Sequence, residues 1–474
     1  MADIGLIGLG VMGANLALNM AEKGHNVAVY NRTPERTDAF MASAGDLAPK
    51  LTPVKSLADL AAAVTAPRPI VMMVKAGSAV DEQAAALAPH LAKGDILIDA
   101  GNANFRDTRR REQEWTAKGI DFLGVGVSGG EEGARHGPAV MAGGNPAAWA
   151  RVAPIFNAIA AKFGDEPCAA LVGPEGAGHF VKTLHNGIEY ADMQMIAEIY
   201  GIMRDGLGLS RQEMAGIFTG WNEGPLKSYL IEITGTVLAA VDARTGTPLV
   251  DVILDSAGQK GTGRWAAIEA QDLGVPATVI EAAVAARALS ADKAGRVRAE
   301  ALFGAAPRTI NGTLGPRDTI MATLQEALLA GKIAAYAQGF AVMAKASETW
   351  GWNLPLGTIA KIWRAGCIIR SAFLDDIASA YAGGAVGNLM MVEPFAGMLM
   401  ATNHSLRGVV AASALKGLPV PALGSALAYF DLMRTARTTA DLTQAQRDFF
   451  GAHGFERLDA PGIEAHGPWS SSAA

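Results

Sequence analysis

Five polar side chains between residues 182 and 190 share the spacing of one helix face. They fall at i, i+3, i+4, i+7 and i+8, and they are Lys182, His185, Asn186, Glu189 and Tyr190. The other face of the same segment is apolar, so the spacing predicts an amphipathic helix whose polar side carries proton-transfer groups. A lysine and a glutamate two turns apart could serve one substrate as base and acid. An ordinary solvated helix face would show the same spacing, and the rest of the chain has to decide between the two.

Length and composition predict a folded chain of two or three domains. The sequence has 474 residues, of which 50% are hydrophobic and 18% charged, so extensive burial in a large helical core or a subunit interface is expected. The net charge is −6 and no basic block occurs, which argues against nucleic acid and anionic membranes as main partners.

Cysteine content and targeting signals indicate a cytoplasmic location. The two cysteines, Cys168 and Cys367, are too few for a disulfide framework and are expected to be buried thiols in a reducing compartment. No uninterrupted apolar run reaches the ~18 residues that a membrane helix needs, and no signal peptide precedes the first expected strand.

The N-terminal residues have the pattern of a strand, a glycine turn and a helix. Residues 4–7 are an expected apolar strand, residues 14–23 an expected helix, and residues 26–30 a second strand. The turn contains Gly8, Leu9, Gly10, Val11, Met12 and Gly13. Glycines at these positions let the backbone approach a pyrophosphate, which then lies at the N-terminus of the helix. The segment therefore predicts a dinucleotide-binding βαβ unit.

The residues after the second strand indicate which dinucleotide binds. An acidic residue there would accept the ribose 2′-hydroxyl of NAD, but the sequence has Asn31, Arg32 and Thr33. A guanidinium suits a 2′-phosphate, so Arg32 favours NADP. Two alternatives stay open: an acidic residue elsewhere would admit NAD, and Arg32 could be a surface cation beside Glu35.

Three further apolar runs continue the alternation of strands and helices. Residues 70–74, 96–100 and 122–127 are expected strands of a doubly wound, Rossmann-like parallel sheet in an α/β domain of residues 1–176. Ligands bind beyond the carboxyl ends of such strands, and the candidates there are Val74, Lys75, Ala76, Asn102, Ser128, Gly129 and Gly130. Asn102 suits both nicotinamide and substrate, and the Ser-Gly-Gly turn suits a carboxylate. Glycines after strands are also common turn formers.

Residues 177–434 are expected to form a large all-helical domain with an internal helical repeat. Residues 189–191 resemble residues 335–337 at an offset of about 145 residues, and a Trp-x-x-Gly segment at Trp221 recurs at Trp363. Only the first copy carries the polar stripe, so the second copy is expected to be structural.

Another part of the helical domain has residues suited to a phosphate. Lys260 and Thr262 lie in a polar turn with two glycines, and Arg287 lies in an otherwise apolar helix. A cation, a hydroxyl and flexible amides suit an anion. A helix-capping loop and an arginine that reaches out to solvent are the plainer alternative.

The C-terminal segment, residues 435–474, is more polar than the helices before it. It contains Arg447 and His453 within the sequence QRDFFGAH. A tail of this kind is expected to lie across a surface or a partner.

Seven sequence motifs, found in one order along nearly the whole chain, resemble those of the decarboxylating 6-phosphogluconate dehydrogenases. They are the glycine turn, VKAG at 74–77, VSGGEEGA at 127–134, KTLHNGIEY at 182–190, QKGTGRW at 259–265, RAGCIIR at 364–370 and QRDFFGAH at 446–453. The length resembles the long-chain, dimeric branch. The resemblance implies a cytoplasmic oxidoreductase of the pentose phosphate pathway and of gluconate utilization. Its reaction would be oxidative decarboxylation of 6-phosphogluconate to ribulose 5-phosphate and CO2, with NADP reduced to NADPH.

The resemblance also implies a role for each candidate residue. Lys182 would be the proton acceptor and Glu189 the proton donor. The sugar acid would be surrounded by Asn102, Ser128, Gly129, Gly130, His185 and Asn186, and its 6-phosphate held by Tyr190, Lys260, Thr262 and Arg287. Arg447 and His453 would come from the partner's tail, so each active site would depend on a homodimer.

Two residues depart from the family's pattern. Ala100 and Ala139 stand where the family has a glycine and a serine, which could change the shape of the pocket.

The mechanism is expected to use no metal. Some oxidative decarboxylases use a divalent metal to stabilise the enolate, but no carboxylate cluster suited to one occurs in the sequence. Lys182 as an ammonium is expected to stabilise the enolate instead.

Two rival functions are considered. A 3-hydroxyacid dehydrogenase of the 3-hydroxyisobutyrate type would share the first domain and a helical lysine, but would not need the phosphate-binding residues. A non-catalytic NADP-binding scaffold would have no need to keep Lys182 and Glu189, whose burial is costly.

Overall fold

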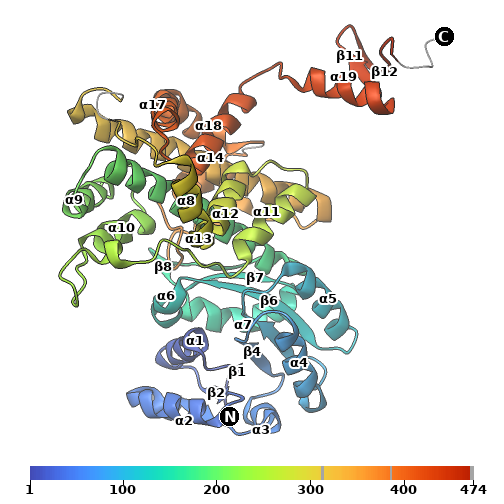
Figure 1. Ribbon diagram of the computed structural model, residues 1–474. Coiled ribbons are helices and arrows are strands. Elements are labelled where there is room, and N and C mark those ends of the chain that lie inside the picture. Colours follow the sequence, from blue (N-terminus) through green and yellow to red (C-terminus); the bar gives the residue numbers. More distant parts are fainter. Residues whose placement is uncertain (311–313, 385–386, 470–474) are drawn as a thin grey trace. The chain divides into compact units, whose positions relative to one another are not determined.

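An eight-stranded sheet forms the centre of the N-terminal domain (Figure 1). The computed structural model describes residues 1–310, 314–384 and 387–469. Across the sheet the strand order is β10-β7-β6-β5-β4-β1-β2-β3. The strands are β1 (Ile4–Ile7), β2 (Val27–Tyr30), β3 (Leu51–Pro53), β4 (Pro69–Met72), β5 (Ile96–Asp99), β6 (Asp121–Ser128), β7 (Ala139–Gly143) and β10 (Ala169–Gly173), and β8 (Lys162–Phe163) and β9 (Glu166–Pro167) form a small separate hairpin.

Six of the strands have the order and direction of a Rossmann sheet. Strands β3, β2, β1, β4, β5 and β6 are parallel neighbours, and the order reverses between β1 and β4, where such sheets bind their ligand. At the other edge the sheet departs from the expected parallel arrangement, because β7 runs antiparallel to β6 and β10 runs parallel to β7. Only residues 129–138 join β6 to β7, and a parallel crossover needs about a dozen residues or more.

Helices cover both faces of the sheet. They are α1 (Val11–Glu22), α2 (Pro34–Ser43), α3 (Leu57–Ala63), α4 (Ser78–Leu87), α5 (Phe105–Thr116), α6 (Gly130–His136) and α7 (Pro146–Ile159). One core packs α1 and α7 against the sheet through Leu16 and Phe156, and a second core packs α3, α4 and α5 through Leu60, Val80 and Trp115. Burial on both faces explains why the inner strands are continuous apolar runs.

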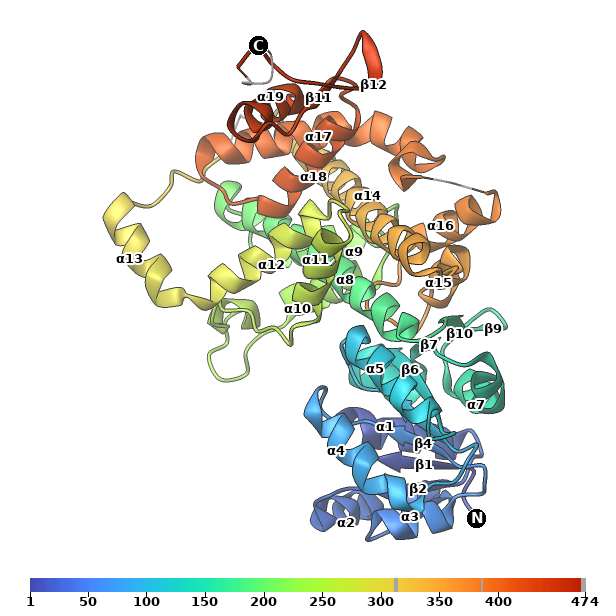
Figure 2. The same cartoon turned by 90° about the vertical axis from the view of Figure 1, so that its right-hand side faces the viewer.

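The long helix α8 (Ala177–Gly201) joins the sheet to the helical domain (Figure 2). Its N-terminal part packs on β6 and β7, and its later part packs on helices of the second domain. A Cβ at Gly178 would collide with the carbonyl oxygen of Gly124, so glycine is what allows the helix to lie this close to the sheet. The helix is buried on almost every side, and within the polar stripe only Glu189 is partly exposed.

The helical domain follows the order that the repeat predicts. Its helices after α8 are α9 (Arg211–Trp221), α10 (Tyr229–Ala239), α11 (Thr262–Asp272), α12 (Thr278–Ala291), α13 (Lys293–Phe303), α14 (Arg317–Trp350), α15 (Leu356–Ile362), α16 (Phe373–Ala382), α17 (Phe395–Lys416) and α18 (Pro421–Met433). In each copy a long helix precedes a short helix that ends at or next to the repeated tryptophan. The next helix then begins with an aromatic residue followed by leucine, Tyr229-Leu230 in α10 and Phe373-Leu374 in α16. Ser228 and Ser371, at matching places in the two copies, form an antiparallel bridge.

One helix within the described residues is long and apolar enough to cross a membrane by length and composition. It is Thr319–Trp350, with a mean hydropathy of 1.3, and 89% of its apolar window is buried in the protein. The core helix of a globular domain passes the same test, so this finding is weak evidence for a membrane span.

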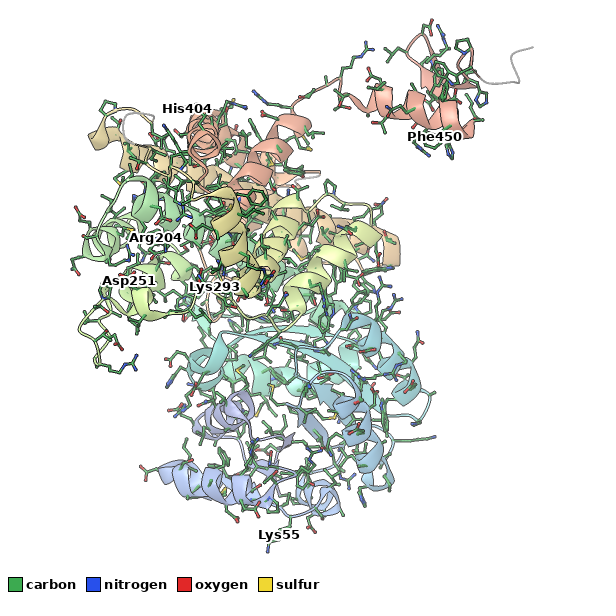
Figure 3. The ribbon with its side chains drawn as sticks, in the orientation of Figure 1. Lys55, Arg204, Asp251, Lys293, His404 and Phe450 are labelled. Atoms are coloured by element: carbon green, nitrogen blue, oxygen red, sulfur yellow. The ribbon has the colours of Figure 1, made fainter. Side chains whose placement is uncertain are left out.

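The C-terminal residues from Leu427 form a compact unit of their own. The unit contains α19 (Ala440–Gly451) and an antiparallel hairpin of β11 (Phe455–Arg457) and β12 (Ala460–Ala465). Buried Asp448 accepts hydrogen bonds from the N–H groups of Gly454 and Gly467 and from the indole of Trp469. Apolar side chains remain exposed on it, among them Phe450, which Figure 3 labels on α19.

Candidate active site

The glycine turn leaves open space in front of the N-terminus of α1. Gly8 has a φ of +98°, and a Cβ on it would collide with the carbonyl oxygen of Met73. A Cβ on Gly13 would collide with the carbonyl oxygen of Gly8, whereas a Cβ on Gly10 would meet nothing within 4 Å. No side chain caps the helix at Gly10. The turn is therefore shaped for a pyrophosphate on the helix N-terminus.

A cavity of about 600 Å³ opens beside this turn. Of the expected cofactor residues, its lining includes Gly8, Gly10, Asn31, Arg32, Thr33, Val74 and Lys75. Leu9 and Gly13 are buried within the turn and the helix, and Leu9 donates its N–H to Asn31 Oδ1 at 3.0 Å. Asn31 thus holds the turn, in addition to lining the cavity.

Two charged residues that the sequence analysis missed also line the cavity. Arg36, one turn after Arg32, adds a second guanidinium, and Glu82 on α4 adds a carboxylate. Within the described residues, neither Arg32 nor Arg36 forms an ion pair with a carboxylate, so the Glu35 partner considered above is not found. The spacing of four residues at the start of a helix was the sequence signal for Arg36.

Lys182, Ser128 and His185 form a buried hydrogen-bonded cluster where α8 crosses β6. Lys182 Nζ donates to Ser128 Oγ at 2.9 Å and lies 3.5 Å from His185 Nδ1, and Ser128 Oγ lies 3.2 Å from His185 Nε2. A Cβ at Gly126 would approach the Lys182 Cβ to 2.5 Å, so a glycine on β6 makes the room for this side chain. Only 6% of Lys182 is exposed, and His185 is fully buried.

The hydrogen-bond network assigns the tautomer of His185. Asn186 donates through Nδ2 to Thr262 Oγ1 at 2.9 Å, so its Oδ1 faces His185 Nδ1 at 3.0 Å and accepts the proton there. His185 Nε2 is then free to accept from the Ser128 hydroxyl. The serine in turn accepts from Lys182, which gives a chain from lysine to serine to histidine.

Burial moves the lysine and the glutamate of the stripe toward their neutral forms. It lowers the pKa of Lys182, with Glu189 opposing the shift, and it lowers the pKa of His185 still further from its ordinary value. Burial raises the pKa of Glu189, against the opposing charges of Lys182 and Arg287. Glu189 lies 3.8 Å from His185 Nδ1. A neutral amine and a neutral carboxylic acid on one helix face are the forms that a base and an acid need.

The expected phosphate residues come together only in part. The guanidinium of Arg287 lies 3.6 Å above the ring of Tyr190. The same ring packs against Gly263 so closely that a Cβ on this glycine would collide with it. Thr262 begins α11 and is buried beside Asn186. Lys260 precedes the helix and is exposed.

The remaining predicted residues have different surroundings. Asn102 is exposed just beyond β5, and Gly130 is exposed at the start of α6. Gly129 has a φ of +107° and packs on the carbonyl of Gly366, where a Cβ would approach to 2.6 Å. Arg447 and His453 are exposed on the C-terminal unit, where Arg447 donates to Gln444.

The second-copy segment at 363–367 packs against α8 beside His185, a contact that the sequence did not predict. The ring of Trp363 packs edge-on against His185 at 5.5 Å between centroids. Cys367 is fully buried, and burial raises its pKa to about 12, with the charge of Lys182 opposing the shift. The RAGCIIR motif was the signal available in the sequence.

The two departures from the family pattern place their methyl groups in the core. Ala100 belongs to the cluster that packs α1 and α7 on the sheet. Ala139 is fully buried at the start of β7 and donates its N–H to the carbonyl of Gly366.

Over the described residues, no group of three or more His, Cys, Asp or Glu side chains is arranged to hold a metal ion.

Comparison with known proteins identifies the family of both halves of the chain. Residues 3–173 match the NAD binding domain of 6-phosphogluconate dehydrogenase, and residues 178–469 match the 6-phosphogluconate dehydrogenase C-terminal domain.

Three full-length relatives agree with this assignment. Two are decarboxylating 6-phosphogluconate dehydrogenases of Bacillus subtilis, each 48% identical. The one described as NAD(+)-dependent matches over 99% of this chain and 99% of its own, and the one described as NADP(+)-dependent over 98% and 99%. A solved structure of Plasmodium falciparum 6-phosphogluconate dehydrogenase, described in its apo form and with NADP+ and with 6-phosphogluconate, has a TM-score of 0.95 at 41% identity. It covers 98% of this chain and 100% of its own. With its Rossmann-like sheet, its buried Lys182 cluster and these full-length matches, the chain belongs to the family of decarboxylating 6-phosphogluconate dehydrogenases.

Proposed function

We propose that this chain oxidises and decarboxylates 6-phosphogluconate to ribulose 5-phosphate and CO2 while reducing NADP, as a step of the pentose phosphate pathway. The observation that carries the proposal is the buried cluster of Lys182, Ser128 and His185 with Glu189 two turns along the same helix. The nucleotide cavity fits the cofactor, because Gly8 and Gly13 have no room for a Cβ and Gly10 faces open space. When bound, the nicotinamide supplies the hydride acceptor.

In the proposed mechanism Lys182 acts twice. As a neutral amine it takes the proton of the C3 hydroxyl, since a proton must leave that oxygen as hydride leaves the carbon. As an ammonium it then stabilises the negative charge that develops on the C3 oxygen when CO2 departs. Glu189, whose pKa burial raises in the direction of the neutral acid, delivers a proton to C1. The mechanism uses no metal.

The first experiment follows absorbance of the reduced cofactor with 6-phosphogluconate while CO2 is trapped. Equal amounts of NADPH and CO2 are expected. Cofactor reduction without CO2 would indicate a hydroxyacid dehydrogenase of the 3-hydroxyisobutyrate type, and no reduction with NADP or NAD, in folded protein, would leave the scaffold function.

Arg32 is proposed to select NADP, with Arg36 as a second cation. Both guanidinium groups line the cavity, and neither is paired with a carboxylate of the described residues. Glu82 lines the same cavity and is the acidic residue that would serve NAD instead. The two Bacillus subtilis relatives use different cofactors at the same sequence identity, so the cofactor preference of this chain has to be measured.

Substitution of Arg32 is expected to change the cofactor preference. An Arg32→Ala variant loses a charged hydrogen bond to the 2′-phosphate, so its kcat/KM for NADP should fall about 10- to 100-fold, while its kcat/KM for NAD stays nearly constant. The measurement is steady-state kinetics with both cofactors. Glu35→Gln is the matched control, because it removes an exposed charge from the first turn of the same helix. Equal losses with NAD and NADP would contradict the assignment.

The pH profile is expected to show two limbs. kcat/KM for 6-phosphogluconate should rise with pH as Lys182 loses its proton, at an apparent pKa below that of an ordinary lysine. It should fall as Glu189 loses its proton, at an apparent pKa above that of an ordinary glutamate, because burial shifts both groups in these directions. A Glu189→Gln variant should lose the limb that belongs to the acid. A falling limb that survives this substitution would assign it to another group.

The C-terminal unit is proposed to complete the active site of a second subunit. It exposes the apolar side chains of Phe449, Phe450 and Leu458, which are suited to burial against a partner. We also propose the division into residues 1–176, 177–434 and 435–474, with Arg447 and His453 reaching the partner's substrate. A homodimer follows from this proposal, and a cytoplasmic location is proposed separately from the two buried free cysteines.

Mixed dimers test the exchange of tails. A Lys182→Met homodimer and an Arg447→Ala/His453→Ala homodimer should each be nearly inactive. In a refolded equimolar mixture, half the dimers are mixed and one of their two sites has both Lys182 and an intact tail, so about a quarter of wild-type activity should return. If each tail served its own subunit, the mixture would show no recovery.

A further inference from the structure

Arg111 is the buried member of a run of three arginines on α5. The exposed fraction of its side chain is 1%, whereas that of Arg110 is 46%. Its Nε and Nη2 donate to the two carboxylate oxygens of Asp81, at 2.9 and 2.8 Å, and Nη2 also donates to the carbonyl of Gly77 at 2.9 Å. This fork holds the first turn of α4 and the end of the VKAG loop, which carries Lys75.

The remaining nitrogen of Arg111 faces a second loop. Nη1 lies 3.5 Å from Asp99 Oδ2, at the end of β5, and Asp99 is fully buried. Within the described residues neither of these two atoms has a hydrogen-bond partner, so the two charges compensate each other. Asp99 Oδ1 accepts the N–H of Gly101 at 3.1 Å. The carboxylate therefore fixes the turn that presents Asn102.

The same helix also contacts the catalytic helix. Thr108, one turn before Arg111, hydrogen-bonds through Oγ1 to Nδ1 of buried His179 at 2.8 Å. His179 lies on α8 one turn before Lys182. The VKAG loop, the turn after β5 and helix α8, which all carry proposed site residues, thus contact α5.

We infer that Arg111 and Asp99 are positioning residues that hold the Lys75–Gly77 loop and the Gly101–Asn102 turn at a fixed separation for the cofactor. A stability role alone would not need this arrangement, because apolar side chains of similar volume stabilise a core as well as or better than buried ion pairs. The two hydrogen bonds to Asp81 and the one to the Gly77 carbonyl instead fix the position of the loop relative to α5. The inference rests on the proposed function for its kinetic consequences, since it concerns the same cofactor site.

The experiment separates position from stability by removing the two buried charges together. Arg111→Met alone leaves Asp99 uncompensated and should lower both Tm and activity. Arg111→Met/Asp99→Asn removes the unpaired charge, so Tm should recover. The kcat/KM for NADP should stay about 100-fold below wild type because the loops are no longer held in place. Arg110→Met, which removes an exposed contact to the same Asp81, should change kcat/KM by less than about 2-fold. Recovery of kcat/KM together with Tm in the double variant would overturn the inference.

Two further measurements keep the result decisive. If the double variant does not fold, Arg111→Lys keeps the charge but not the fork, and it should fold with kcat/KM for NADP reduced about 10-fold; wild-type kinetics would overturn the inference. If the wild-type protein does not turn over 6-phosphogluconate, the proposed function fails, but NADPH binding by fluorescence still tests the positioning. Binding should weaken about 10-fold or more in the double variant and not in Arg110→Met, and unchanged binding would overturn it.

Discussion

A Lys182→Met variant is expected to lose between about 100-fold and 10,000-fold in kcat, the range associated with a positioned general base. Methionine is close to lysine in length and leaves the packing against Gly126 intact, so the loss would come from the missing amine. The measurement is kcat at saturating 6-phosphogluconate and NADP, with NADPH binding as a check that the nucleotide cavity is undisturbed.

The same variant is expected to be no less stable than the wild type. Burial lowers the pKa of Lys182 in the folded state, so folding disfavours the charged amine. That penalty is fully present at pH values below the lowered folded pKa and disappears above the pKa of the unfolded chain. Lys182→Met removes the penalty, so its Tm at neutral pH should equal or exceed that of wild type, and any gain should vanish at strongly alkaline pH. A marked fall in Tm would mean that Lys182 also has a structural role.

The sequence predicted the polar stripe of α8 because helical periodicity is a local property. The register of Lys182, His185, Asn186 and Glu189 follows from their spacing alone, and α8 has the expected face. Burial of that polar face did not follow from the spacing, since it depends on the sheet and on α11 and α14, which pack around the helix from distant parts of the sequence. An isolated polar stripe reads equally well as solvated, so its burial had to come from the tertiary structure.

Residues that act through long-range contacts were the ones that sequence reasoning missed. Arg111 is one of three adjacent arginines, and its helical spacing from Thr108 and Trp115 was the only local sign that it, unlike exposed Arg110, lies on the buried face of α5. Its partners Asp81 and Asp99 lie on other elements and could not be read from that spacing. Gly366 supports Gly129 from more than two hundred residues away. Arg36 was accessible in principle, because it lies one helical turn after Arg32. The antiparallel edge of the sheet was also foreseeable, since the connection from β6 to β7 is too short for a parallel crossover.

A second buried lysine, Lys332, is expected to matter for stability and not for activity, the opposite of Lys182. Lys332 on α14, in the copy of the repeat that lacks the polar stripe, lies 2.8 Å from Asp192 Oδ2 on α8, and both side chains are 1% exposed. Its ammonium also lies 3.3 Å from Ser228 Oγ. The pair connects the two long helices of the repeat.

A Lys332→Met variant is expected to be destabilised by about 3–5 kcal/mol, because Asp192 would be left as a buried carboxylate without its counter-charge. The measurement is the free energy of unfolding from urea titration, followed by a probe of the helical domain. Catalysis per folded molecule should remain near the wild-type value, because Lys332 is outside the Lys182 hydrogen-bond chain. A large loss of kcat in fully folded protein would contradict the structural assignment.

A second substitution identifies the cause of this loss of stability. The double variant Lys332→Met/Asp192→Asn has no buried charge and should recover most of the lost stability at neutral pH. If the double variant stayed as unstable as the single one, lost packing would be the cause. The two buried lysines therefore differ in their partners: Lys182 hydrogen-bonds to the uncharged Ser128, and burial lowers its pKa, whereas Lys332 is paired with the carboxylate of Asp192.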